Sequence, residues 1–322
     1  MKIYHLCMIM IVSIIICSCS KISLIDKKGN VINDIKHKTV IALWPKGTDG
    51  INTKIKEKIR GEWDSHYNIH NPSLTVYVPK VPNGTSIIVF PGGGYVDVAY
   101  NAIGVPTAEM LIEEGVTVFV LKYRLPNTKG VDFKYPVPLM DAQRAIKLVR
   151  YNAAVFGLNP NRIGIMGFSA GGHLASIAGT MFHKPVSNKD AIDKISCRPD
   201  FMMLIFPVIT TQAKPFIHNC PENLISENSD PNLLKQLSTE LNVTVDTPPT
   251  FLAHAKDDIP VPHQNSVLFY EALKKNGVQT DLKLYNEGGH FVGFFDKKKG
   301  CDALNWINDV VLWLRNMKFI SK

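Results

Sequence analysis

Residues 162–173 read Arg-Ile-Gly-Ile-Met-Gly-Phe-Ser-Ala-Gly-Gly-His, and the rest of the chain is interpreted outward from them. The apolar half of this stretch has the length of a buried parallel strand, and an Ala-rich helical pattern continues to about Thr180. Between strand and helix lies Gly-x-Ser-x-Gly, in which Gly167 and Gly171 allow a close approach of the two elements. The pattern predicts that Ser169 is a nucleophile held at the top of a sheet.

Apolar segments alternate with helical patterns on both sides of this motif. Strands are expected at 74–78, 86–90, 116–121, 163–166, 201–208, 250–253 and 280–285, and helices at 106–114, 139–156, 170–180, 267–275 and 303–317. This alternation predicts an α/β fold, with a mostly parallel central sheet and helices on both of its faces. Trp306 and Trp313 are expected to cover the core. Residues 210–247 are rich in Pro, Asn and Ser, which favours a small lid insertion over a second domain.

The composition is that of an ordinary globular protein, with 45% hydrophobic and 20% charged residues among 322. The formal net charge is +8, but there is no basic stripe with interleaved aromatic residues, so nucleic acid is not an expected partner. Cys197, Cys220 and Cys301 follow the N-terminal segment, and none has metal-ligand spacing with a histidine. Their odd number leaves open whether any two of them form a disulfide.

The N-terminus has the features of an export signal. Lys2 supplies positive charge, residues 7–16 form an almost unbroken apolar run, and Cys19 follows a small residue. This pattern resembles a bacterial lipobox, whose cysteine is lipidated; Cys17 fits less well because Ile16 precedes it. The alternatives are a plain signal peptide and a short membrane anchor, although the run is short for a spanning helix.

The sequence therefore predicts three segments. Residues 1–18 are expected to be a lipoprotein signal peptide, and residues 19–60 a polar, Lys-rich tether with an N-terminal edge segment. Residues 61–322 are expected to form the α/β domain, with its insertion at about 210–247. Lipidation of Cys19 would anchor the mature protein in the membrane of a bacterial cell envelope, as a periplasmic or outer-membrane lipoprotein.

A serine nucleophile needs a histidine base within hydrogen-bond distance and an acid that orients this histidine. His290 follows the last expected strand in a Gly-Gly-His loop, so we expect it to be the general base. Asp257 and Asp258 both follow the preceding strand; we favour Asp258 as the acid because it lies three residues before a Val-Pro pair. His173 and His254 have no comparable position and are expected to be packing residues.

An oxyanion hole needs backbone N–H groups that face the developing negative charge. Residues 91–95 read Pro-Gly-Gly-Gly-Tyr and end an early buried strand, where such groups belong. We expect the donors to be Gly93 and Gly94, together with Ala170 at the start of the nucleophile helix. An ordinary glycine turn is the alternative. Tyr95 is expected to line the acyl or leaving-group pocket.

Further segments extend the pattern: they are 91–95, 119–125, 141–145, 159–173, 246–254, 265–266 and 269–270. Together they resemble bacterial acetylxylan-esterase-like α/β-hydrolases over about residues 72–295. The resemblance implies the α/β-hydrolase fold, with Ser169, Asp258 and His290 as the catalytic triad. The chain departs from the family at Ile103, where an acidic residue is usual, and in the loop 291–293, so the resemblance leaves the substrate open.

The resemblance implies a serine carboxylesterase that removes acetyl groups from a carbohydrate such as acetylated xylan or related hemicellulose oligosaccharides. It implies no metal and no organic cofactor. A prolyl-oligopeptidase-like peptidase is one alternative, but such enzymes usually carry a large additional domain for which this chain has no room. A catalytically inactive binding lipoprotein is another, and the loss of a triad residue would favour it; all three residues are present.

Overall fold

A computed structural model describes residues 23–44, 51–52, 54–61, 64–126, 128–184, 190–225, 230–291 and 301–321. The expected signal peptide and the lipidation candidate Cys19 lie outside these residues, as does most of the loop after His290. Among the described residues no helix is both long and apolar enough to cross a bilayer.

The described residues form an eight-stranded central sheet. Across the sheet the strands are β1 (Val40–Ala42), β4 (Ser73–Tyr77), β6 (Thr117–Lys122), β5 (Ser86–Phe90), β7 (Ile163–Phe168), β8 (Phe201–Ile205), β9 (Thr250–Ala255) and β10 (Thr280–Tyr285). β4 pairs antiparallel with both β1 and β6, and all other neighbours are parallel. The predicted mostly parallel sheet is confirmed. Its inner strands are buried along their whole length, as near-continuous apolar runs require.

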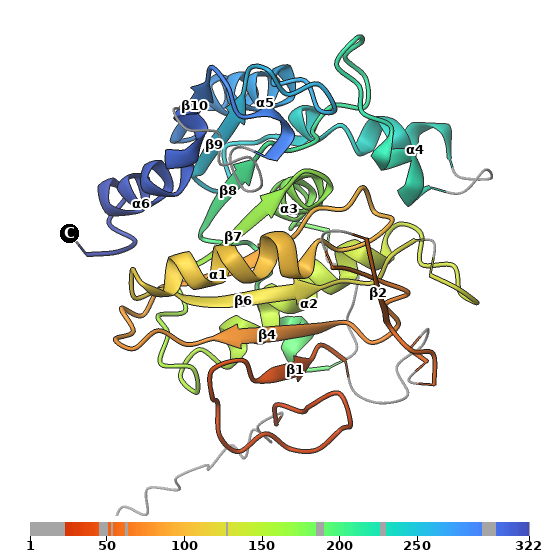
Figure 1. Cartoon of the computed structure of the whole chain (residues 1–322), viewed down its shortest axis with the longest axis vertical. Coiled ribbons are helices and arrows are strands. Elements are labelled where there is room, and N and C mark those ends of the chain that lie inside the picture. Colours follow the sequence, from red (N-terminus) through yellow and green to blue (C-terminus); the bar gives the residue numbers. More distant parts are fainter. Residues whose placement is uncertain are drawn as a thin grey trace, which may run out of the picture.

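Helices cover both faces of this sheet (Figure 1). They are α1 (Val105–Ile112), α2 (Val137–Tyr151), α3 (Ala170–Thr180), α4 (Pro231–Gln236), α5 (Gln264–Lys275) and α6 (Trp306–Asn316). The two tryptophans of α6 are buried as expected: Trp306 packs edge-on against Phe168 of β7, and Trp313 lies beside Phe201 of β8. Helix α6 thus packs against β7, the strand that leads to Ser169. A separate two-stranded sheet, β2 (Lys58–Arg60) with β3 (Ser65–Tyr67), lies outside the central one.

Strand β1 comes from the range 19–60, which was expected to be a tether with an N-terminal edge segment. It adds an antiparallel edge to β4, and the following Trp44 is buried, with its indole N–H donating to Asp141 of α2. The central sheet therefore begins before residue 61. The position of β1 could not be read from a sequence pattern, because three residues are too few to show alternation and the pairing partner lies more than thirty residues away.

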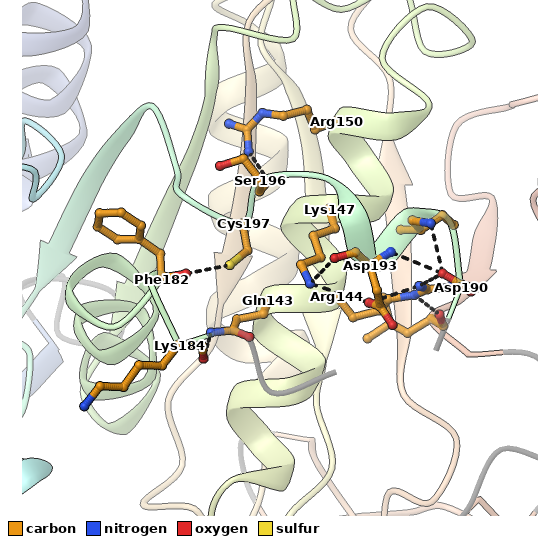
Figure 2. Close-up of polar contacts among 12 residues, drawn as sticks. Gln143, Arg144, Lys147, Arg150, Phe182, Lys184, Asp190, Asp193, Ser196 and Cys197 are labelled. Atoms are coloured by element: carbon orange, nitrogen blue, oxygen red, sulfur yellow. Dashed lines mark hydrogen bonds and ion pairs between the residues drawn. The ribbon is translucent and has the colours of Figure 1, made fainter. Parts of the chain in front are cut away.

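Three cations on α2 hold the connection that leads into β8 (Figure 2). Arg144 forms a two-pronged ion pair with Asp190, Lys147 donates to the carbonyl of Asp193, and Arg150 donates to the carbonyl of Ser196. Cys197, Cys220 and Cys301 are all buried free thiols, so none of the three is in a disulfide.

The insertion follows β8 and contains α4 between two short 3₁₀ turns, Cys220–Leu224 and Thr239–Asn242. In Figure 1, α4 lies to the right of the sheet, the side toward which β7 points. The insertion therefore lies at the carboxyl ends of the parallel strands, where open α/β sheets bind their ligands.

Candidate active site

Ser169 lies in the turn between β7 and α3 with φ 53° and ψ −121°. This backbone conformation is strained for a residue with a side chain, and such strain concentrates at functional sites. The turn is tight: a Cβ atom on Gly167 would lie 2.4 Å from the carbonyl oxygen of Gly171, and one on Gly171 would lie 2.1 Å from that of Phe90. The two glycines therefore allow β7, α3 and the end of β5 to meet beneath the serine.

The structure brings Ser169, His290 and Asp258 into one hydrogen-bonded row. His290 Nε2 lies 2.9 Å from Ser169 Oγ, and His290 Nδ1 lies 2.8 Å from Asp258 Oδ2. Asp258 follows β9 and His290 follows β10; because these strands are parallel neighbours, their carboxyl ends are adjacent. With Nδ1–H donating to the carboxylate, Nε2 is left to accept the serine proton.

Asp258 is held by more than His290. Its side chain is fully buried, its Oδ1 accepts from the backbone N–H of Val261 at 2.9 Å, and its Oδ2 also accepts from His254 Nε2 at 3.0 Å. Burial opposes ionisation of this carboxyl group, but the hydrogen bonds from His254 and His290 outweigh it and lower its pKa to about 2. Asp258 is therefore a fixed negative charge at neutral pH.

The neighbouring Asp257 has a different position. It is exposed, and its carboxylate accepts from the backbone N–H groups of Gly289, at 2.9 Å, and Gly288, at 3.3 Å. Asp302 accepts from the N–H of Asn286 at 2.9 Å in the same loop. Of the two candidates for the acid, only Asp258 is bonded to the His290 ring, while Asp257 holds the loop that carries it.

Residues 91–95, which we call the glycine loop, follow β5 and lie against the turn that carries Ser169. Gly93 has φ 130° and Gly94 has φ 62°, which glycine adopts without strain, and a Cβ atom on Gly92 would lie 3.0 Å from that of Ser169. Among the described residues, the backbone N–H groups of Gly93, Gly94 and Ala170 have no protein acceptor. These are the N–H groups expected to form the oxyanion hole, and they remain available to a substrate.

Tyr95 was expected to line the acyl or leaving-group pocket, but its side chain is fully buried. Its hydroxyl donates to His173 Nδ1 at 2.9 Å, and His173 Nε2 donates to the carbonyl oxygen of Leu237 at 2.8 Å. A buried phenol needs a polar partner, and the nucleophile helix supplies it in His173. Burial lowers the pKa of His173 to about 4, so the ring stays neutral in this chain of bonds. Neighbouring residues in sequence gave no sign of this pairing.

The insertion supplies contacts that the sequence did not reveal. Asn223 Nδ2 donates to the carbonyl oxygen of Gly94 at 2.9 Å, and Asn265 Nδ2 donates to that of Phe216 at 3.0 Å. His218 lies between Phe216 and Asn223 in the sequence, and its burial, together with the charge on His290, lowers its pKa. Single polar residues in a Pro- and Asn-rich segment carry no pattern, so only the folded chain shows their use.

The fold and this hydrogen-bonded row define the chain as an α/β-hydrolase with a Ser–His–Asp site. The BD-FAE family model matches residues 74–273, which include Ser169 and Asp258, and the chain belongs to that family. Within the described part of the chain, no group of three or more His, Cys, Asp and Glu side chains is arranged to hold a metal ion.

Known relatives agree with the sequence resemblance. The chain is 34% identical to an acetylxylan esterase of Xylanibacter ruminicola over 76% of its own length and 48% of the relative's. It is 32% identical to endo-1,4-beta-xylanase B of Butyrivibrio fibrisolvens over 63% of its own length and 32% of the relative's. The chain thus spans half or less of the length of these two proteins.

Among solved structures, an acetyl ester-xyloside bifunctional hydrolase from Caldicellulosiruptor lactoaceticus is 36% identical, with a TM-score of 0.74, covering 90% of this chain and all of the other. The Est2 esterase of Thermogutta terrifontis, in its propionate-bound form, is 25% identical, with a TM-score of 0.63, over 84% of this chain and 97% of that one. The predicted fold and family resemblance are confirmed.

Proposed function

We propose that this protein is a serine carboxylesterase that removes acetyl groups from acetylated xylan or related hemicellulose oligosaccharides. The row of 2.9 Å and 2.8 Å contacts from Ser169 through His290 to Asp258 carries the proposal, because it is the arrangement that activates a serine hydroxyl. The named substrates of the relatives support the choice of an acetylated xylan.

In the proposed reaction Ser169 Oγ attacks the ester carbonyl carbon while His290 Nε2 takes the hydroxyl proton. Asp258 keeps His290 in the correct tautomer and stabilises the imidazolium. The N–H groups of Gly93, Gly94 and Ala170 stabilise the tetrahedral oxyanion. His290 then protonates the departing sugar alkoxide, leaving acetyl-Ser169. Water, deprotonated by His290, attacks this ester and releases acetate.

Hydrolysis of p-nitrophenyl acetate by the mature protein, beside a peptide p-nitroanilide, tests the reaction class. We expect ester turnover and no amide turnover, and loss of any one triad member, as in Ser169→Ala, typically lowers kcat by about 10⁴–10⁶-fold. Anilide hydrolysis would instead favour a peptidase. Wild-type turnover by the Ser169→Ala variant would show that another group is the nucleophile, and no turnover by the wild type would favour a binding protein.

A series of p-nitrophenyl esters from acetate to octanoate tests acyl selectivity. The insertion lies at the end of the sheet that carries the triad, so we expect it to leave a small acyl pocket and a wider groove for the alcohol. Each mismatched methylene then costs about 1–3 kcal/mol, or roughly 10–200-fold in kcat/KM. Rising kcat/KM toward octanoate would contradict an acetyl esterase. Acetate release from acetylated xylan, mannan and monosaccharides identifies the sugar.

We also propose that Cys19 is lipidated and anchors the enzyme to a membrane of the bacterial cell envelope. The apolar run and the Ser18-Cys19 pair support this. In cells labelled with a fatty-acid probe, Cys19→Ala is expected to abolish labelling and release the protein from membranes, while Cys17→Ala leaves both unchanged. Membrane retention of an unlabelled Cys19→Ala variant would point to an uncleaved anchor.

A further inference from the structure

One oxygen atom of the candidate catalytic acid is shared by two histidines. Asp258 Oδ2 lies 2.8 Å from His290 Nδ1 and 3.0 Å from His254 Nε2. His254 is the fifth residue of β9 and precedes Asp258 by four positions, so a rigid strand carries it. The acid therefore has one imidazole on the side of the nucleophile and a second one on the side of the core.

The contacts of His254 fix its protonation state. Its Nε2 faces two acceptors, Asp258 Oδ2 and the carbonyl oxygen of Val261 at 2.9 Å, so Nε2 must carry the proton. Its Nδ1 lies 2.8 Å from Ser266 Oγ of α5, whose hydroxyl can donate to it. The ring is fully buried, and this burial lowers the pKa of His254, so the imidazole is neutral and acts as a donor toward the acid.

We propose that His254 is a positioning residue that fixes the rotamer of Asp258 and shares its negative charge. Asp258 then binds protonated His290 less tightly than it would without this second donor. The proposal rests on the esterase function proposed above. Without the second donor, Oδ2 would be a stronger acceptor with fewer constraints on its direction. It would bind protonated His290 more tightly and orient neutral His290 less well.

Other groups around the pair do not duplicate this contact. The N–H of Val261 bonds to Oδ1, the other oxygen of Asp258. Asp257, in the same loop, bonds to the backbone of Gly288 and Gly289. His218 of the insertion accepts from the N–H of Cys220 through its Nδ1 atom. Among the described residues, two side chains thus donate to Asp258 Oδ2, and they are His290 and His254.

Two variants of similar size separate positioning from packing. His254→Met fills the space without a donor, and His254→Gln keeps an N–H near the position of Nε2. We expect His254→Met to lower kcat for p-nitrophenyl acetate about 10-fold, since the lost bond is to a charged group. We also expect the acidic limb of its kcat/KM profile to move to higher pH, because protonated His290 is favoured. His254→Gln should keep most of the kcat and the wild-type profile.

Thermal unfolding of both variants is measured beside the kinetics. A packing role would lower Tm in both variants and leave the acidic limb of the kcat/KM profile at its wild-type pH. That result would overturn the proposal. An equal shift of the acidic limb in His254→Gln and His254→Met would overturn it as well, since the N–H would then be irrelevant. The wild type serves as the control: if it fails to hydrolyse the ester, the esterase function itself is wrong, whereas an active wild type isolates the role of His254.

Discussion

At the scale of single residues, the site depends on glycines, whose lack of a Cβ atom lets backbone segments approach closely. Gly171 has no Cβ atom, and the place where one would lie is 2.1 Å from the carbonyl oxygen of Phe90 and 2.4 Å from that of Pro91. Backbone cannot move aside as a flexible side chain can. Gly171→Ala is therefore expected to push the glycine loop away from Ser169.

We expect Gly171→Ala to lower kcat more than 10-fold and to destabilise the fold by about 1–3 kcal/mol, the usual cost of overpacking. Gly179→Ala, on the same helix, is the control, because the backbone there is helical and an added Cβ atom would meet only the side-chain end of Met202. Activity assays and thermal unfolding of the two variants measure the difference. Equal kcat values would show that the glycine loop adapts to the extra methyl group.

The two adjacent aspartates should respond differently to loss of charge. Asp258→Asn removes the charge that stabilises protonated His290 and replaces one of two accepting oxygens by an NH2 donor, so it is expected to lower kcat about 10⁴-fold, as in other triads. Asp257→Asn keeps an oxygen that can accept from Gly289, so a loss of less than about 10-fold is expected. Steady-state kinetics on p-nitrophenyl acetate compare them. The reverse ranking would transfer the role of acid to Asp257.

The sequence was informative at this scale wherever chemistry leaves a local pattern. Gly-x-Ser-x-Gly and Gly-Gly-His singled out Ser169 and His290, because tight turns need glycine. It was uninformative where a contact joins distant segments. Tyr95 is the example: its position next to the glycine loop suggested a pocket, but its partner His173 lies 78 residues away.

At the scale of elements, the glycine loop is fixed from two directions. On the side of the nucleophile helix, Tyr95 is bonded to His173 of α3. On the side of the insertion, Asn223 donates to the carbonyl oxygen of Gly94. Both ties control where the N–H groups of the loop point. Asn223→Ala is therefore expected to lower kcat about 10-fold with little effect on KM for p-nitrophenyl acetate.

Asn242→Ala is the matched control, since that side chain bonds within the insertion, to the carbonyls of Gln236 and Ser238. A wild-type kcat for Asn223→Ala would show that the lower tie alone positions the loop. The sequence predicted the insertion but none of these bonds. It placed the longer helices and strands within a few residues because their apolar periodicity is strong. It did not predict β1, β2 and β3, which have three residues each and are too short to show a period.

At the scale of the whole molecule, buried titratable groups set the pH range of stability. His173 has a pKa of about 4 in the fold, against about 6.5 when unfolded, so the unfolded chain binds a proton first. Stability should thus fall as pH drops from about 6.5 to 4, by an amount on the order of 3 kcal/mol. Asp258, with a pKa of about 2, stabilises the fold above its unfolded value and loses this effect between about pH 4 and 2.

Urea unfolding between pH 7 and 3 measures both effects. His173→Gln is expected to be less stable at pH 7, because the bonds to Tyr95 and Leu237 change, but to lose less stability between pH 6.5 and 4. The slope of stability against pH is the decisive quantity. Parallel slopes for the variant and the wild type would show that other groups control the acid limit.

The anchoring of the insertion has a consequence for protein engineering. Exchanging residues 210–247 between homologues is an obvious way to change the substrate, since this segment lies over the end of the sheet that holds the triad. Yet the segment also contributes Asn223 to the Gly94 carbonyl and the Leu237 carbonyl to His173. A chimaera that replaces both would acquire a new groove and a misplaced oxyanion loop. Grafts should therefore retain these two contact points and vary the residues between them.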